Sequence, residues 1–345
     1  MKIIKSVLDN FEGNIVTKIT LINDNGVQAS CLTMGATWQE FLVPNKKGDL
    51  TNLLLSFAET KDYYSNPLCV CQSIGRVAGR INNGSCVLNG KQITLPKNNN
   101  GNTLHGGPNG FNTLNWDYTV SETKNSVSAI FQTKITEQAD GFPGDMLATI
   151  IYTLDNQDCV TITYSALADN KDTLFNPTNH VYFNLSDRQD LATHSLKINS
   201  SQYLDLADDL IPTGRVHSVE DSPYDFQKFS NVKQAAQAVC GFDDAFVVNE
   251  PGKANEPIAI LRDNESGRQV TIDSCRNGLV MYSMAEIPSG IKFSRDNGKE
   301  AIGGEGLALE AQTLPDAINQ ENFGDIVLPK FSKKTYRISY KFDQI

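Results

Sequence analysis

The chain has 345 residues, of which 40% are hydrophobic and 20% are charged, a composition typical of a globular protein large enough to bury a sizeable core. Its 30 basic and 40 acidic residues give a net charge of −10 at pH 7, and no basic block could displace counterions from nucleic acid phosphates. Apolar runs such as residues 53–55 are far too short to cross a bilayer. We therefore expect neither a nucleic acid partner nor a membrane span.

The N-terminus and the cysteines predict a cytoplasmic location. A charged residue, Asp9, interrupts the start of the chain before an apolar stretch of signal-peptide length accumulates. The seven cysteines are irregularly spaced, which suits a reducing compartment better than a disulfide framework. Cys69 and Cys71 form the one close pair. Without a second pair or a nearby histidine, we expect them to be small core residues and not metal ligands.

Turn signals separate short alternating segments along the whole chain. Asn25-Gly26 and Asn89-Gly90 each lie between alternating runs and predict hairpins. Residues 126–135, 148–154 and 160–166 alternate apolar with polar side chains and are rich in β-branched and aromatic types. This pattern predicts half-buried antiparallel strands.

The second half of the chain continues the same pattern with one exception. Residues 231–239 (NVKQAAQAV) have the composition of a short helix, and Ser230 is its expected N-cap. Ser266-Gly267 predicts a third hairpin, and residues 335–342 a C-terminal strand. One helix among so many strands predicts an all-β protein. No linker or compositional shift divides the chain, so we expect a single domain, residues 1–345, built as a large antiparallel β-sandwich.

The four histidines are candidates for proton transfer, because the unperturbed pKa of histidine, about 6.5, lies near neutrality. His105 is followed by Gly106-Gly107, which allow close backbone approach in a ligand-facing loop. His180 lies among polar side chains in residues 176–184 (NPTNHVYFN), and these would be costly to bury unpaired. A satisfied turn or core histidine is the alternative for each. His194 and His217 lie in polar sequence, and we expect both at the surface.

Two carboxylates complete the candidate chemistry. Glu310 follows an apolar strand-like run, and an acid at the end of such a strand is costly to bury unpaired and can have a raised pKa. Asp243 lies between aromatic residues in residues 241–246 (GFDDAF). The structural alternatives are a salt-bridged glutamate and an exposed turn aspartate.

Known cofactor and metal motifs do not occur in the sequence. Arg76 and Arg80 belong to GRVAGR, which lacks the glycine spacing and the lysine of a phosphate-binding loop. Dinucleotide, nucleophile-elbow, zinc-protease and EF-hand motifs are also missing from the sequence. We therefore expect proton transfer by histidine and glutamate, with no cofactor and no metal.

Taken together, the motifs resemble those of the aldose 1-epimerase family, the galactose mutarotases. Seven motifs occur in the family's order and at its approximate spacing. They are residues 75–81 (GRVAGRI), 104–107 (LHGG), 141–144 (GFPG), 176–185 (NPTNHVYFNL), 210–214 (LIPTG), 241–243 (GFD) and 309–317 (LEAQTLPDA).

The resemblance implies a β-sandwich with a sugar cleft across one sheet and a function in anomer interconversion of free hexoses such as D-galactose and D-glucose. It implies that His180 is the general acid that protonates the ring oxygen, and that Glu310 is the general base at the C1 hydroxyl. His105 and Arg80 would hold the ring oxygen and the C1 region, and Asp243 would bind sugar hydroxyls. At neutral pH, reference pKa values would leave the glutamate ionised and the histidine partly protonated. We expect a monomer or a homodimer.

The sequence departs from the family pattern at three places near the expected cleft. Gly79 stands where many members have asparagine, and Asp244 where a histidine is frequent. Residues 278–283 (GLVMYS) lack the glutamine that often faces the sugar. None of these departures touches His180 or Glu310.

Three other functions stay open at this point. An epimerase of phosphorylated hexoses would need a cluster of arginines and lysines, and among the motif residues only Arg76 and Arg80 lie close together in the sequence. A glycoside hydrolase needs two carboxylates flanking the bond, which Glu310 and Asp243 could supply, but the two histidine motifs would then be unexplained. A non-catalytic sugar-binding module would bind without turnover. For an aromatic that stacks on the sugar, Trp38, Tyr182 and Phe242 are candidates.

Overall fold

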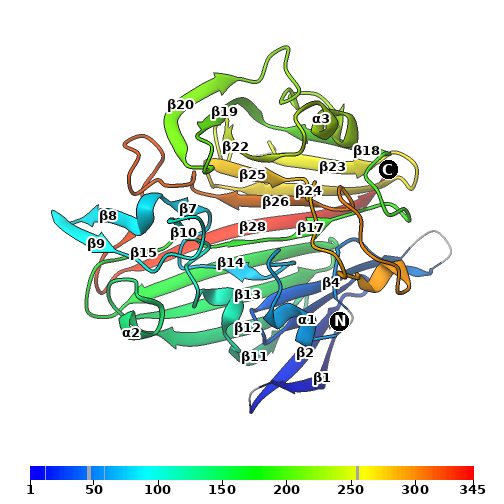
Figure 1. Ribbon diagram of the computed structural model, residues 1–345. Helices are drawn as coiled ribbons and strands as arrows, with labels where there is room; N and C mark the ends of the chain where they lie inside the picture. The colour runs from blue at the N-terminus through cyan, green and yellow to red at the C-terminus, as the bar shows by residue number, and fades with distance from the viewer. Residues whose placement is uncertain (12, 45–47, 58, 254–255) are drawn as a thin grey trace.

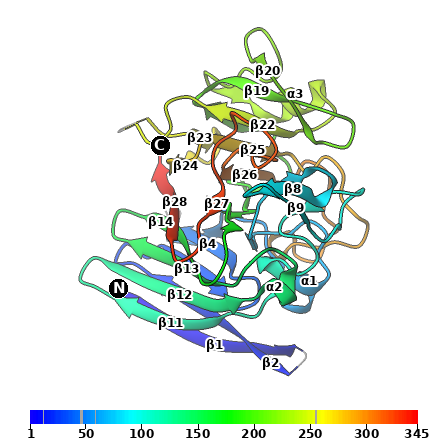
Figure 2. The same cartoon turned by 90° about the vertical axis from the view of Figure 1, so that its left-hand side faces the viewer.

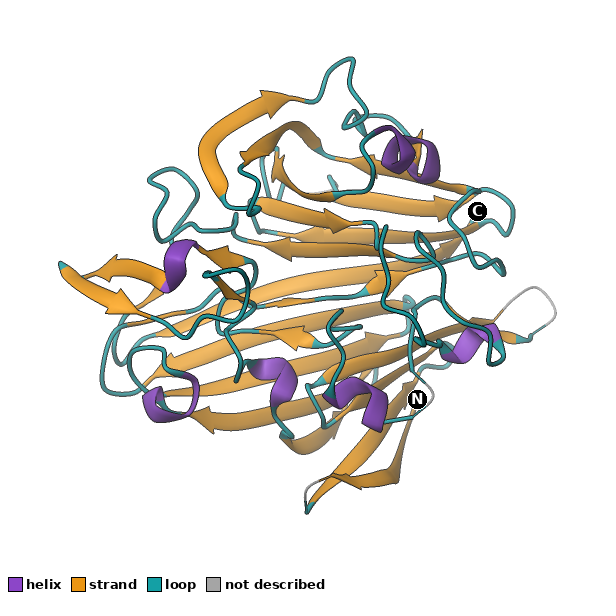
Figure 3. Cartoon of the chain, viewed as in Figure 1, coloured by secondary structure: helices purple, strands orange, loops and turns teal. Residues whose placement is uncertain are grey.

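The computed structural model of the chain describes residues 1–345 except 12, 45–47, 58 and 254–255. Strands dominate it, and every pairing between named strands is antiparallel (Figures 1 and 3). This arrangement confirms the predicted all-β class with large antiparallel sheets. No helix in the described ranges is long and apolar enough to span a membrane.

Three large sheets form the body of the molecule. The nine-stranded sheet has the order β11 (Asp117–Glu122), β12 (Ser126–Ile135), β13 (Met146–Asp155), β14 (Cys159–Ala168), β28 (Lys333–Gln344), β24 (Arg268–Ser274), β23 (Ala259–Asp263), β18 (His194–Ile198) and β21 (Ser230–Asn231). The six-stranded sheet has the order β17 (Tyr182–Phe183), β26 (Leu307–Gln312), β25 (Gly278–Tyr282), β22 (Asp243–Val248), β19 (Ser200–Leu206) and β20 (Pro212–Ser218). The five-stranded sheet runs from β1 (Lys2–Phe11) through β2 (Asn14–Ile22), β3 (Gln28–Leu32) and β4 (Thr37–Pro44) to β5 (Leu50–Asn52).

Shorter elements join these sheets. Four strand pairs are β7 (Arg80–Ile81) with β10 (Thr103–Leu104), β6 (Ser73–Ile74) with β16 (Thr178–Asn179), β8 (Ser85–Leu88) with β9 (Lys91–Thr94), and β15 (Thr173–Leu174) with β27 (Val327–Leu328). The α-helices in the described ranges are α1 (Lys61–Tyr64), α2 (Glu137–Asp140) and α3 (Val232–Ala238), and single 3₁₀ turns cover Asn82–Gly84, Phe111–Thr113 and Ser294–Asp296.

The structure confirms the predicted hairpins and strands, and it corrects one detail of the helix. The three predicted turns join β2 to β3, β8 to β9 and β23 to β24. The N-cap of α3 is Asn231 and not Ser230, because the Asn231 side chain accepts a hydrogen bond of 2.9 Å from the Gln234 amide. Ser230 instead donates its hydroxyl to the Asp225 carbonyl. The one-turn helices α1 and α2 were not predicted, since four residues are too short for a periodic signal.

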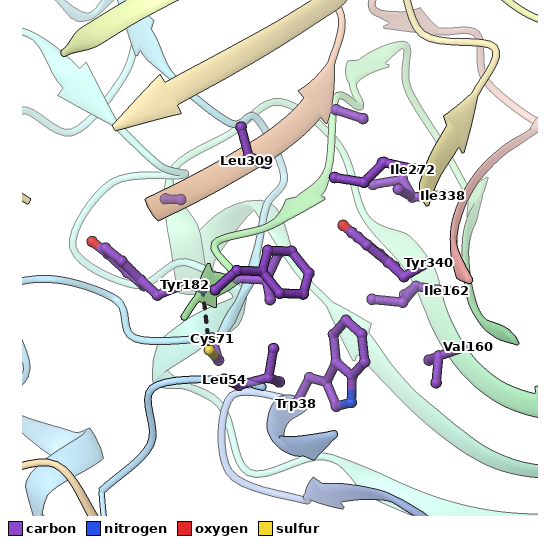
Figure 4. Close-up of a cluster of buried hydrophobic side chains, with 14 of the residues drawn as sticks. Trp38, Leu54, Cys71, Val160, Ile162, Tyr182, Ile272, Leu309, Ile338 and Tyr340 are labelled. Carbon is purple, nitrogen blue, oxygen red and sulfur yellow. Dashed lines mark hydrogen bonds between the residues drawn. The ribbon is translucent and has the colours of Figure 1, made fainter. Parts of the chain in front are cut away.

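The large sheets share one hydrophobic core (Figure 4). Strand β2 packs on β12 and β13, so the five-stranded sheet covers a face of the nine-stranded sheet. Trp38 of β4 contacts Tyr340 of β28 and Phe183 of β17, and all three side chains are fully buried. Trp38 is therefore a core residue, and the prediction that it could stack on a sugar is not supported by its position.

The six-stranded sheet and the arm formed by β7 to β10 lie next to each other in both views (Figures 1 and 2). Side chains from both elements line one cleft, which is described next.

Candidate active site

The cleft has a volume of about 240 Å³ and lies between the six-stranded sheet and the arm. Its floor comes from adjacent strands of the sheet, and its wall comes from the chain segments beside β7 and β10. It brings together the five residues that the family resemblance assigned to the site. They are Arg80, His105, His180, Asp243 and Glu310.

His180 and Glu310 meet at the centre of this cleft although 130 positions separate them in the chain. The His180 Nε2 lies 3.4 Å from the Glu310 Oε1, and the two residues are only 7% and 1% exposed. Glu310 lies inside strand β26, two residues before its end. An imidazole and a carboxyl group, both able to transfer protons, therefore lie next to each other in the cleft.

Aromatic rings and backbone bonds fix the position of His180. Its ring stacks on Tyr182 with centroids 5.0 Å apart, and it meets the His105 ring edge to face with centroids 5.3 Å apart. The His180 amide donates to the Gln72 carbonyl, and its own carbonyl accepts from the Cys71 amide. The Tyr182 hydroxyl in turn donates to the Leu68 carbonyl. The imidazole is thus held in one orientation toward Glu310.

Burial shifts the two groups in opposite directions. It lowers the pKa of His180 to about 4, because a buried imidazolium loses its hydration. It raises the pKa of Glu310 well above its usual range, with a further increase from the nearby Asp243 carboxylate and an opposing effect from Arg80. These directions run against the expectation of an ionised glutamate beside a partly protonated histidine. Both shifts favour the uncharged forms of the two groups, a neutral imidazole and a protonated carboxyl group.

His105 depends on the two glycines that follow it. A Cβ on Gly106 would overlap the Gly75 carbonyl oxygen, so only glycine allows the loop to approach so closely. The Nδ1 of His105 accepts a hydrogen bond of 3.2 Å from the Gly79 amide, which places the ring proton on Nε2. Burial and the neighbouring His180 and Arg80 hold the pKa of His105 well below its usual range. His105 is therefore a neutral hydrogen-bond donor at the cleft.

Arg80 and Asp243 lie on opposite sides of the cleft and contact each other. Arg80 Nη2 lies 3.5 Å from the Asp243 Oδ2, and its Nε donates to the Asn99 side chain at 3.2 Å. Asp243 is one-third exposed at its side chain and begins strand β22. Both groups keep hydrogen-bonding capacity for a polar ligand.

Arg76, the other arginine of the GRVAGR motif, belongs to the interior. Its guanidinium is fully buried and binds both carboxylate oxygens of Asp140, at 2.6 and 3.0 Å. A further bond of 2.7 Å reaches the Thr173 hydroxyl. Arg76 therefore holds the loop after α2 in place and does not face the cleft.

The structure contradicts the prediction that His194 lies at the surface. It lies in β18, is 0% exposed, and its Nε2 accepts a hydrogen bond of 2.9 Å from the Leu185 amide. The polar residues around it in the sequence belong to the adjoining loop, which concealed the buried strand. His217 is exposed, as predicted, and contacts Asp205.

The structure separates the two cysteines of the close pair and the candidate aromatics. Cys71 is fully buried, as predicted, whereas Cys69 is half-buried and lines the cleft. Phe242 packs in the core against Phe226, so Tyr182 is the candidate aromatic that reaches the cleft. In the described part of the chain, no three His, Cys, Asp or Glu side chains gather as metal ligands would.

Three further residues of the cleft were not assigned a role from the sequence. Tyr282 lies directly opposite Asp243 on the neighbouring strand. Asp244, noted only as a departure from the family pattern, also lines the cleft, and burial raises its pKa to about 6. Gln312 follows Glu310 by two positions on β26. That spacing could have predicted its position in the cleft, because alternate residues of a strand share a face.

Comparison with known proteins gives consistent results. The family model described as aldose 1-epimerase matches residues 17–341. The chain is 46% identical to an aldose 1-epimerase of Streptococcus thermophilus over 99% of both chains, and 38% identical to a maltose epimerase of Levilactobacillus brevis, also over 99% of both. Among solved structures, a galactose 1-epimerase from Lactobacillus acidophilus superposes with a TM-score of 0.86 at 26% identity, covering 99% of each chain.

Proposed function

The chain is an epimerase of the aldose 1-epimerase family, and we propose that its cleft interconverts the α and β anomers of free hexoses such as D-galactose and D-glucose. The reaction opens the cyclic hemiacetal, turns the aldehyde about the C1–C2 bond, and closes the ring on the other face. Opening requires one proton delivered to the ring oxygen and one removed from the C1 hydroxyl.

The observation that carries this proposal is the contact between His180 and Glu310 inside the cleft. The ring oxygen and O1 of a hemiacetal are bonded to the same carbon, so the acid and the base must lie beside each other. A separation of 3.4 Å between Nε2 and Oε1 meets that requirement. We assign the ring-oxygen proton to His180 and the C1 hydroxyl proton to Glu310. Each positioned proton-transfer group contributes typically ~10²–10⁴-fold in rate.

A single proton held by the pair would also suit the reaction. With one proton shared between them, the pair is neutral either as a protonated Glu310 with a neutral His180 or as a carboxylate with an imidazolium. Sugar hydroxyls and the Arg80 guanidinium favour the second form, because they stabilise the carboxylate after water has left the cleft. Ring closure reverses both transfers, so neither group is consumed.

The remaining predicted residues have roles that follow from their chemistry. His105, with its proton on Nε2, would donate to the ring oxygen or to a hydroxyl near C1. Arg80 would donate beside it, and the Asp243 carboxylate would accept from sugar hydroxyls. Of the lysines and arginines in the described residues, only Arg80 lines the cleft. This favours an unphosphorylated sugar.

A reducing disaccharide is a second candidate substrate, because a relative that matches 99% of this chain is named maltose epimerase. The chemistry at the reducing end would be the same. A glycoside hydrolase is less well supported, since the group beside Glu310 is an imidazole and Asp243 is paired with Arg80.

Polarimetry tests the proposal. Freshly dissolved α-D-galactose, α-D-glucose or maltose should reach its equilibrium rotation faster when the protein is present, and glycosides should release no reducing ends. The double variant His180→Asn/Glu310→Gln serves as the control for buffer and protein effects. If the wild-type protein leaves all three relaxation rates unchanged, the proposed activity is wrong, and a non-catalytic sugar-binding module becomes the better interpretation.

A further inference from the structure

Gln312 shares the floor of the cleft with the Glu310 carboxyl group. The two residues are separated by one position on β26, so their side chains project from the same face of the sheet. Gln312 is 0% exposed and lines the cleft. Its partner across the neighbouring strand β25 is Gly278, which has no side chain to offer.

The amide group of Gln312 has no hydrogen-bond partner among the described residues. Neither its Nε2 nor its Oε1 is bonded. A buried amide without partners is destabilising, and most buried polar atoms in folded proteins are paired. The buried Gln72 differs, because its Nε2 donates to the Tyr63 and Asn112 carbonyls and only its Oε1 is unpaired. Gln312 makes no such bond, so its side chain does not hold the fold together.

Other polar atoms in this cleft are also buried and unpaired. They are the Oε2 of Glu310 and the Nδ1 of His180, both on residues assigned above to proton transfer. Gln312 thus shares the cleft with residues whose hydrogen bonding the protein alone leaves incomplete. It offers one donor and one acceptor in a single plane.

We propose that Gln312 is a substrate-binding residue whose amide pairs with two neighbouring hydroxyls of the sugar ring, away from C1. The assignment rests on the proposed function. Residues two apart on a strand are about 7 Å apart, so a sugar with C1 at Glu310 presents hydroxyls of C2 to C4 toward Gln312. One hydroxyl donates to Oε1 while the next accepts from Nε2, which selects sugars carrying both.

The substitution Gln312→Met tests this role, since it keeps the side-chain length and removes both polar atoms. We expect kcat/KM for D-glucose and D-galactose to fall about tenfold to a hundredfold, mainly through KM, because two hydrogen bonds to the bound sugar are lost. The melting temperature should stay equal or rise, because an unpaired buried amide is replaced by an apolar group. Gln39→Met is the matched control. Gln39 is buried outside the cleft and donates to the Phe57 carbonyl, so its loss should affect stability and not kinetics.

Deoxy sugars identify the hydroxyls involved. The wild-type protein should lose activity with one or two of 2-deoxy-, 3-deoxy- and 4-deoxy-D-glucose, and Gln312→Met should show no additional loss with those same sugars. An unchanged kcat/KM in both Gln312→Met and Gln312→Ala, with an active wild-type protein, overturns this inference alone. A wild-type protein without epimerase activity overturns the proposed function instead.

Discussion

At the scale of single residues, the chemistry of the cleft is set by burial. His180 and Glu310 have ordinary side chains whose pKa values shift in opposite directions because both lie out of water. The sequence identifies the two groups through their motifs, but it cannot supply their protonation states, which depend on how many atoms cover each ring and carboxyl. The same limit explains Gln312, whose missing partners are visible only once the fold is known.

The pH dependence of the rate follows from this pair. Activity requires one proton on the pair. It should fall on the acid side as His180, with a pKa of about 4, takes up a second proton, and on the alkaline side as the pair loses its proton. His180→Asn and Glu310→Gln should each lower kcat by at least about a hundredfold while circular dichroism stays unchanged. A wild-type rate that does not fall as the pH drops through about 4 would contradict this role of His180.

At the scale of elements, the alternating strands and the turn pairs could be predicted because each depends on local sequence rules. The positions of the two GRVAGR arginines could not be predicted, since residues four positions apart lie in different parts of the structure. Arg80 starts β7 at the cleft, while Arg76 is buried against Asp140 of the one-turn helix α2. This contact joins residues 64 positions apart and depends on tertiary packing, so no local sequence pattern predicts it.

Removal of the Asp140 carboxylate tests this clamp. Asp140→Ala leaves the buried Arg76 guanidinium without its counter-ion, so the free energy of unfolding should drop by about 3–5 kcal/mol. Urea unfolding at pH 7 measures the loss. Lys171→Ala is the matched control, because it breaks an exposed ion pair with Glu137 of the same helix and should cost a small fraction of that amount. Equal losses in the two variants would show that Arg76 is not held by its charge.

At the scale of the whole molecule, the all-β class and the aldose 1-epimerase family were both predictable, since seven motifs spread from residue 75 to residue 317 mark most of the fold. The division into nine-, six- and five-stranded sheets was not, because it depends on pairing between distant strands such as β14 and β28. The single domain, the cytoplasmic location and the oligomeric state stay predictions. The interior also holds more histidine than the sequence suggested, with His194 joining His180 in a buried setting.

The buried His194 makes the stability of the molecule sensitive to acid. Burial lowers its pKa to about 4 in the folded protein, against about 6.5 in the unfolded chain, so the unfolded chain binds the extra proton as the pH falls below 6.5. Between pH 7 and pH 5 this one residue should cost about 2 kcal/mol of unfolding free energy. Buried carboxyl groups with raised pKa values, such as Glu310 and Asp244, act in the opposite direction over the same window. The pH dependence of the wild-type stability alone therefore does not test this effect. The comparison is made with His194→Gln, whose side chain can still accept a hydrogen bond from the Leu185 amide. The difference between the urea unfolding midpoints of the two proteins should shrink or change sign as the pH falls from 7 to 5. If both proteins lose the same amount of stability over this range, His194 does not cause the loss.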